Sequence, residues 1–185
     1  NPGFPIYESV IRYLDAKAVP LPLTESKQWS LDVDALEALI TKRTKMLILN
    51  TPANPTGGII PKRDLERVAQ LAQQHDFWVL TDEIYARILY EGEHASILAV
   101  PGMRERTLLL DGHSKTYAMT GWRLGFAVAP KPVADMIGKF MTNCNSCTAS
   151  FSQMAGMAAV RGPQDAAQAM VAEFRRRRDL IVAGL

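Results

Sequence analysis

Lys115 is the residue of this 185-residue chain whose setting most suggests chemistry. It follows the apolar run Thr107–Leu110, in a loop of small and hydroxylated residues that includes Ser114. An ammonium group is costly to bury unless it is paired or used covalently. Arg123 lies eight positions further on, and its planar guanidinium offers paired N–H donors to a phosphate. The alternative interpretation is an ordinary lysine and an ordinary arginine with their charged ends in water.

Three more polar residues and one aromatic ring complete the set that could take part in chemistry. Asn54 opens an NPTG loop, Asp82 opens a DEIY segment that ends at Tyr85, and Phe4 lies near the start of the chain. Taken alone, each has a structural interpretation. Asn54 fits a turn before proline, Asp82 fits a helix N-cap, and Tyr85 and Phe4 fit half-buried or buried packing positions.

The elements that must position these residues alternate short apolar runs with longer helical patterns, which indicates an α/β fold. The apolar runs are continuous rather than alternating, which favours a mostly parallel sheet covered by helices on both faces. Ligand sites in such sheets lie beyond the carboxyl ends of the strands, where Asn54, Asp82 and Lys115 fall. The patterns predict strands at 18–23, 45–50, 77–81, 107–110 and 124–129, and helices at 7–15, 31–41, 61–75 and over most of the chain from 132 onward.

The composition argues against several classes of function. The chain has 21 basic and 19 acidic residues, so its formal net charge of +2 is too small to draw it onto nucleic acid or an anionic membrane. Small molecules are the expected partners. No apolar run approaches the roughly 20 residues that span a bilayer, and no charged-then-apolar leader opens the chain, so a cytoplasmic location is expected.

Cys144 and Cys147 form a C-x-x-C pair, which can indicate a redox or metal site. A zinc site normally needs four ligands, and no second pair completes this one. We therefore expect two reduced thiols and no metal site. The four successive arginines from Arg175 to Arg178 point in different directions around a helix, so a solvated helix is expected there rather than a binding face.

Three segments together resemble the class I/II aminotransferases, which are enzymes of pyridoxal 5'-phosphate (PLP). The stretch SKTYAMTGWRLG, residues 114–125, resembles the lysine signature of that family. The NPTG and DEIY segments match two further signatures in the same order, and the opening NPGFP segment falls where the family places an aromatic ring against the cofactor. Each segment is short, but their order and separations make a strong signal over essentially the whole chain.

The resemblance implies the roles of the catalytic residues. Lys115 would hold PLP as a Schiff base and, once freed by substrate, would move a proton. Asp82 would keep the ring nitrogen protonated, because a neighbouring carboxylate favours the positive form. Tyr85 and Asn54 would donate hydrogen bonds to the phenolate oxygen of the cofactor.

The resemblance also implies further cofactor contacts and one departure. Phe4 would stack on the ring, while Arg123 and Ser114 would bind the phosphate. Many family members carry a hydroxyl three positions before the lysine, but this chain has Gly112 there, so the second phosphate ligand is open. We expect His113 to serve packing or a loop hydrogen bond rather than catalysis.

The resulting hypothesis is PLP-dependent transfer of an amino group between an amino acid and a 2-oxo acid in a homodimeric enzyme. Residues 1–170 are expected to be part of the PLP-binding large domain, and residues 171–185 to begin a helix leading to a further domain, so that the fragment alone would be inactive. A PLP-dependent C–S lyase or synthase, and a PLP-sensing regulator, are the alternatives. No arginine occurs between Arg123 and Arg161, so aspartate specificity has no support in the sequence.

Overall fold

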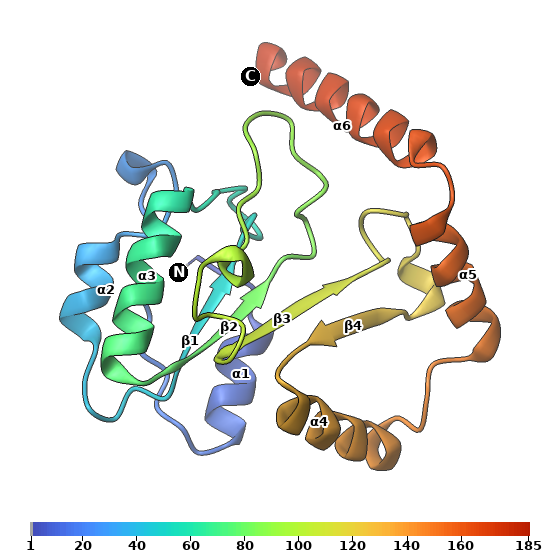
Figure 1. Ribbon diagram of the computed structural model, residues 1–185. Helices are drawn as coiled ribbons and strands as arrows, with labels where there is room; N and C mark the ends of the chain where they lie inside the picture. The colour runs from blue at the N-terminus through green and yellow to red at the C-terminus, as the bar shows by residue number, and fades with distance from the viewer. Residues whose placement is uncertain (1) are drawn as a thin grey trace.

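A four-stranded sheet forms the centre of the computed structural model, which describes residues 2–185 (Figure 1). The strands lie in the order of the sequence, and β1, β2 and β3 run parallel while β4 is antiparallel to β3. The predicted α/β class with a mostly parallel sheet is therefore confirmed. The strand bounds are β1 (Met46–Asn50), β2 (Trp78–Asp82), β3 (Thr107–Gly112) and β4 (Gly125–Val128).

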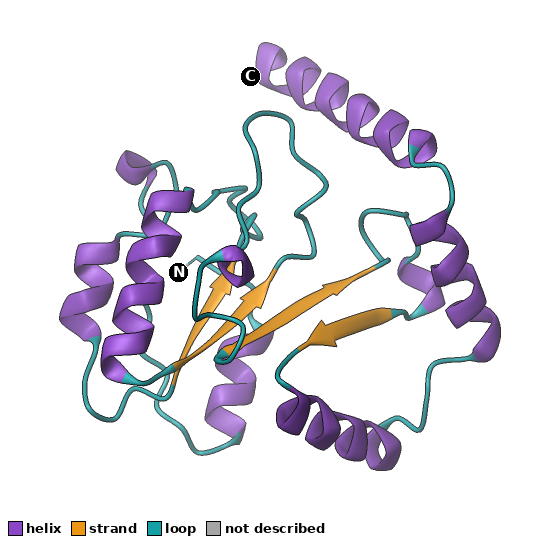
Figure 2. Cartoon of the chain, in the orientation of Figure 1, coloured by secondary structure: helices purple, strands orange, loops and turns teal. Residues whose placement is uncertain are grey.

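Within residues 2–185, six α-helices and three short 3-10 turns surround this sheet (Figure 2). Local chemistry sets several helix ends. Asp32 accepts a hydrogen bond from the Ala35 backbone N–H and so caps α2, while Pro61 directly precedes α3. The helices are α1 (Ile6–Tyr13), α2 (Val33–Leu39), α3 (Lys62–His75), α4 (Lys131–Cys144), α5 (Ser150–Arg161) and α6 (Asp165–Gly184), and the short turns are η1 (Glu25–Lys27), η2 (Ile97–Ala99) and η3 (Thr120–Trp122).

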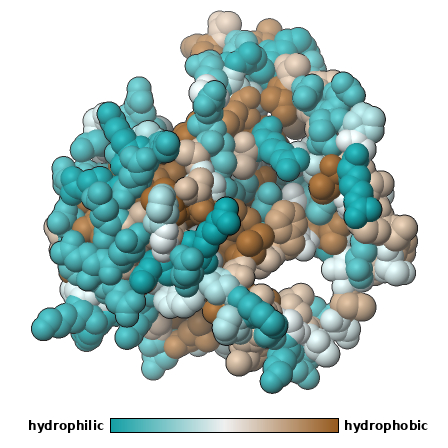
Figure 3. All heavy atoms as spheres, in the orientation of Figure 1, coloured by the Kyte–Doolittle hydropathy of each residue, from teal (hydrophilic) through white to brown (hydrophobic). Residues whose placement is uncertain are grey.

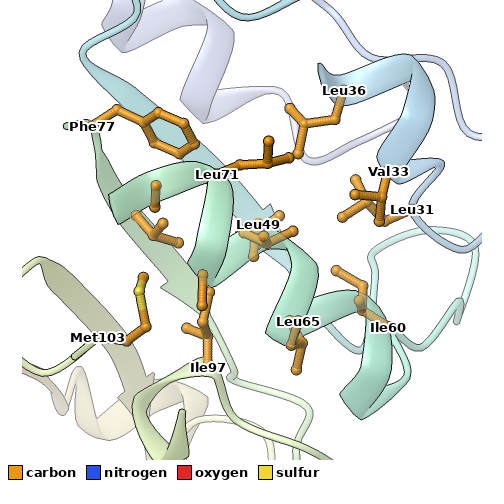
Figure 4. Close-up of a cluster of buried hydrophobic side chains, with 14 residues drawn as sticks. Leu31, Val33, Leu36, Leu49, Ile60, Leu65, Leu71, Phe77, Ile97 and Met103 are labelled. Atoms are coloured by element: carbon orange, nitrogen blue, oxygen red, sulfur yellow. The ribbon is translucent and has the colours of Figure 1, made fainter. Parts of the chain in front are cut away.

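The main hydrophobic core lies between one face of the sheet and helices α2 and α3 (Figure 4). Burial alternates along β2, where Val79 and Thr81 are buried and their neighbours are half-buried. Val79 contributes to the core with Leu49 of β1, and Phe77, just before β2, is fully buried. Burying a side chain of this kind stabilises a fold by about 1.5–3 kcal/mol. The core therefore fixes the strands whose ends carry Asn54 and Asp82.

The opposite face of the sheet carries Asp82 and is contacted by α1. Trp78, Leu80 and Asp82 alternate with the core residues of β2, so their side chains point away from α3. Tyr7 of α1 hydrogen-bonds the Asp82 side chain, which places α1 on this face.

The chain from β4 onward is far more exposed than the rest. All four residues of β4 are exposed, and within residues 125–184 only Ser152 and Gly156 are buried. Apolar side chains such as Phe140 and Phe151 are 62% and 72% exposed. Figure 3 shows an opening between β4, α4 and α5 that no side chain fills. Within residues 2–185, no helix combines the length and apolar character needed to cross a membrane.

One expectation about the strands was wrong. Residues 18–23 are an extended segment without strand pairing. Two prolines, Pro20 and Pro22, remove backbone donors there, which disfavours a place in a sheet.

The features expected in the C-terminal part lie on exposed surfaces. Cys144 and Cys147 are free, exposed thiols. The arginine run lies on α6, where Arg176 and Arg177 hydrogen-bond Glu173 and Arg178 pairs with Glu91, so the expected solvated helix is confirmed. α6 is continuous across position 170, and the division of the chain into 1–170 and 171–185 remains a prediction.

Candidate active site

Asp82 is the last residue of β2, and its carboxylate is held from two sides. Asp82 Oδ1 accepts a hydrogen bond from the Ile84 backbone N–H at 3.2 Å, and Oδ2 accepts one from the Tyr7 phenol. The Asp82 backbone oxygen accepts hydrogen bonds from Thr51 N at 3.1 Å and Asn50 Nδ2 at 3.3 Å. Backbone and side chain are therefore both fixed at the carboxyl end of the strand.

Phe4 reaches the same place through Tyr7. The two rings meet edge to face, with centroids 6.2 Å apart and planes at 71°. Phe4 is 45% exposed, so a large part of this residue is accessible. An exposed aromatic ring one contact away from Asp82 fits the predicted stacking role better than core packing does.

The NPTG loop is tied to the end of β1 by Asn50. Asn50 Oδ1 accepts a hydrogen bond from the Asn54 backbone N–H at 2.8 Å, while the same side chain donates to Asp82 as described. Gly58 is packed so closely that an added Cβ would lie 2.2 Å from the Trp29 carbonyl oxygen. The Asn54 side-chain amide makes no hydrogen bond within residues 2–185, so it is free for a ligand.

Lys115 and Tyr85 lie next to each other although they come from different loops. The Lys115 Nζ atom lies 5.8 Å from the centroid of the Tyr85 ring. In the described part of the chain, neither the Lys115 ammonium nor the Tyr85 hydroxyl forms a hydrogen bond or ion pair. Their loops follow β3 and β2, which are neighbouring parallel strands, so both side chains emerge at one edge of the sheet.

The two loops are also joined by a second contact. Arg87 Nη1 donates a hydrogen bond to Tyr117 Oη at 2.7 Å, and Tyr117 Oη donates to Gln164 Oε1 at 3.0 Å. Arg87 lies two residues after Tyr85, and Tyr117 lies two residues after Lys115. This connection holds the two candidate catalytic loops together and links both to the chain just before α6.

Ser114 and Arg123 line one small pocket of about 210 Å³, together with Gly112 and the backbone that leads into β4. Arg123 has a left-handed backbone with φ of 51°, and its Nη1 donates to the Thr120 carbonyl at 2.9 Å. A serine hydroxyl and a guanidinium at one pocket are donors of the kind that bind a phosphate. The structure thus brings together the two predicted phosphate ligands.

The glycine at position 112 has a packing reason. Gly112 pairs with Gly125 of β4, and an added Cβ at Gly112 would lie 2.9 Å from the Gly125 Cα atom. Any side chain there requires the two strands to separate. The hydroxyl that many family members carry at this position is therefore incompatible with this strand pairing.

His113 is buried, with 6% of its surface exposed, between Tyr117 and Phe126. Neither ring nitrogen has a hydrogen-bond partner among the described residues. The packing interpretation is confirmed, whereas a loop hydrogen bond from the side chain is not seen.

Two residues of the site, Tyr7 and Asn50, were missed by sequence reasoning. Asn50 had a readable signal, because a polar residue ends an otherwise apolar strand. Tyr7 had none, since its partner is 75 positions away and only the tertiary fold brings them together.

The donor set fits PLP. Free side-chain donors from Asn54 and Tyr85, a fixed carboxylate at Asp82, an amine at Lys115 and a phosphate pocket at Arg123 lie at the same end of the sheet. No described group of three or more His, Cys, Asp and Glu residues could hold a metal ion.

Comparison with known proteins shows which family this chain resembles. The model of the family described as "Aminotransferase class I and II" matches residues 1–185. An aspartate aminotransferase of Musicola paradisiaca is 41% identical over 100% of this chain and 46% of its own length. An aromatic-amino-acid aminotransferase of Thermococcus litoralis is 40% identical over 98% of this chain and 47% of its own length.

Solved structures agree. The aromatic aminotransferase from Pyrococcus horikoshii superposes with a TM-score of 0.95 at 38% identity, covering 98% of this chain and 49% of that protein. The aspartate aminotransferase from Thermus thermophilus with maleate superposes with a TM-score of 0.93 at 37% identity, covering 100% and 49%. The chain thus spans about half the length of the relatives that it matches.

Proposed function

Because this chain belongs to the class I and II aminotransferases, a family that generally depends on PLP, we propose that the full-length protein transfers an amino group between an amino acid and a 2-oxo acid. The observation that carries the proposal is the free Lys115 amine beside Tyr85, at the sheet edge where Asp82 is fixed. PLP, when bound, supplies an electron sink that makes the Cα proton of an attached amino acid acidic.

Each side chain then has a task that its surroundings support. Lys115 anchors the cofactor and afterwards carries the proton, for which a side chain without an ion pair is suited. Asp82 holds a proton on the ring nitrogen by opposite charge. Asn54 and Tyr85 donate to the ring oxygen, Phe4 covers the ring, and Ser114 and Arg123 hold the phosphate.

The substrates belong to the full-length protein. Relatives at similar identity carry the names of an aspartate aminotransferase, an aromatic-amino-acid aminotransferase and an arginine–pyruvate transaminase. Because these names span acidic, aromatic and basic substrates, the family alone does not select the amino acid. We expect a homodimer in solution, which light scattering on the full-length protein tests.

The direct test is Lys115→Ala in the full-length protein. We expect loss of the visible absorbance of bound PLP and of PLP trapped by borohydride reduction, while the matched variant Lys139→Ala, on the exposed helix α4, retains both. A Lys115→Ala protein that still traps PLP would show that another lysine binds the cofactor. Incubation of the wild type with candidate amino acids and a 2-oxo acid, followed by analysis for the new amino acid and for released ammonia, separates transamination from elimination.

A further inference from the structure

Tyr7 connects α1 to the centre of the candidate site. Among the described hydrogen bonds of α1, those of Ser9 and Arg12 stay within the helix or its first turn, to Pro5 and Glu8. The Tyr7 phenol instead donates to Asp82 Oδ2, across 75 positions of sequence. A half-buried phenol that leaves its own helix to meet the one fixed carboxylate of the site has a specific partner rather than a general packing role.

The Asp82 carboxylate receives one donor on each oxygen. Ile84 N–H bonds Oδ1 at 3.2 Å and Tyr7 bonds Oδ2, so the plane of the carboxylate is set by two groups from different parts of the chain. Hydrogen bonds donated to a carboxylate stabilise its negative form. Each oxygen can accept a further hydrogen bond. A cationic ring nitrogen can therefore be bound without breaking either contact.

Tyr7 is suited to this position because it stays neutral. Burial, followed by the hydrogen bond to Asp82 and the charge of Asp82, raises the pKa of Tyr7 well above its usual range. The phenol therefore remains a donor at any working pH. A lysine or arginine in its place would orient the carboxylate but would also offset its charge, so the carboxylate would hold a proton on the ring nitrogen less strongly.

We propose that Tyr7 is a positioning residue that orients the Asp82 carboxylate toward the ring nitrogen of PLP without cancelling its charge. The inference rests on the proposed function, because it assigns Tyr7 to the same cofactor site. It adds a residue of α1 to a set otherwise drawn from Phe4 and the loops that follow the strands. The edge-to-face contact with Phe4 makes Tyr7 a shared support of two cofactor contacts.

The test is Tyr7→Phe in the full-length holoenzyme, which removes the hydroxyl and keeps the ring. Tyr13→Phe is the matched control, since Tyr13 lies on the same helix, is 88% exposed and has no hydroxyl hydrogen bond within residues 2–185. We expect the PLP dissociation constant to rise about tenfold in Tyr7→Phe, as for loss of a hydrogen bond to a charged group. The pH midpoint of the visible absorption band should move upward, because a less firmly protonated ring withdraws less charge. Tyr13→Phe should change neither quantity.

A double-mutant cycle with Asp82→Asn shows whether Tyr7 acts through Asp82. We expect Tyr7→Phe to have no further effect on PLP affinity or on the absorption midpoint in the Asp82→Asn background. Wild-type affinity and midpoint in Tyr7→Phe, or an undiminished effect in the Asp82→Asn background, would overturn the inference and leave the proposed function intact. Failure of the wild type to bind PLP would instead overturn the proposed function.

Discussion

Two regions of the chain, on either side of the lysine loop, differ sharply in how many of their residues are buried. Residues 31–112, the packed region, contain the core between the sheet and helices α2 and α3, with Phe77, Val79 and Ile97 fully buried. Residues 125–184, the open region, bury only Ser152 and Gly156. The open region nevertheless carries large apolar side chains on its surface. Apolar surface on this scale is typical of a face that another part of a protein or a partner covers.

The candidate site lies where the two regions meet. The packed region provides Asn54, Asp82 and Tyr85, which follow or end strands that contribute to the core. The lysine loop, residues 113–124, leads from β3 into the open region and carries Lys115 and Arg123. An added Cβ at Gly156 of α5 would lie 2.2 Å from Leu124 and 3.2 Å from His113, so the open region packs directly against this loop.

The two halves of the candidate site therefore have different structural supports. The carboxylate and the ring-oxygen donors follow strands that are packed into the core against α2 and α3. The lysine and the phosphate ligands depend in part on helices whose outer faces are exposed here. Variants in the two regions are therefore expected to differ in their effects on stability.

The first prediction compares two phenylalanines. Phe77→Ala removes a fully buried ring from the packed region and should lower the free energy of unfolding by about 3–5 kcal/mol. Phe151→Ala, at a ring that is 72% exposed, should cost less than about 0.5 kcal/mol in this chain. Urea denaturation followed by circular dichroism measures both.

The same two variants can also be measured in the full-length protein. There we expect the cost of Phe151→Ala to rise, because further chain is available to cover α5, while the cost of Phe77→Ala stays the same. Equal costs for the two variants in the 185-residue chain would contradict the division into packed and open regions.

The second prediction compares two carboxylates that each accept several hydrogen bonds. Glu83 is 4% exposed, and it accepts from Ser96 Oγ at 2.8 Å and Thr81 Oγ1 at 3.2 Å, with His94 Nε2 at 2.7 Å. Glu83→Gln removes the charged acceptor and should cost about 2–3 kcal/mol. Glu173→Gln, in the exposed arginine cluster of α6, should leave the urea midpoint unchanged. A larger loss at Glu173 than at Glu83 would reverse the comparison.

Much of the packed region was predictable from sequence. Continuous apolar runs gave three of its strands to within two residues, and Pro61 marked the start of α3, because these signals are local. The candidate ligands were predictable for the same reason, since each stands next to a strand end. The erroneous strand at residues 18–23 shows the limit, because two prolines outweigh an apolar pattern where no neighbouring strand is available.

The contacts between distant segments were not predictable. The Tyr7–Asp82 hydrogen bond and the Arg87–Tyr117–Gln164 connection each join positions at least 30 apart. Such pairs depend on register and helix docking, which one sequence does not encode in any local pattern. The close approach of Gly112 and Gly125 is likewise a property of strand pairing.

The third prediction compares two glycines, one in each region. Gly112→Ala would place its Cβ 2.9 Å from the Gly125 Cα, so β3 and β4 must separate and stability should fall by about 1–2 kcal/mol. Gly138 lies inside α4 with no atom near its missing Cβ, and Gly138→Ala should raise stability by about 0.5–1 kcal/mol. Thermal melts of the two variants should therefore shift in opposite directions, and a shift in the same direction would count against the strand pairing described here.

The fourth prediction, with the smallest effect, concerns how the burial of a carboxyl group in the packed region changes stability with pH. Burial raises the pKa of Asp111 in the folded state above its ordinary value of 3.8, with a partly opposing hydrogen bond from the Gly112 backbone N–H. The folded state then binds the proton more tightly than the unfolded state. The contribution of Asp111 to folding stability is therefore fully present below pH 3.8 and is lost as the pH rises through the folded-state pKa. Asp111→Asn should therefore raise the melting temperature slightly at pH 7, and this gain should vanish as pH falls toward 3.8.

Asp32→Asn is the control, for which the opposite change in melting temperature is expected. The hydrogen bond from Lys27 lowers the pKa of Asp32, and asparagine preserves the helix cap. Asp32→Asn should lower the melting temperature at pH 7, and this loss should become smaller in acid. Melting curves of both variants between pH 3.8 and pH 7 measure the two changes, and a rise for Asp32→Asn or a fall for Asp111→Asn at pH 7 would contradict the prediction.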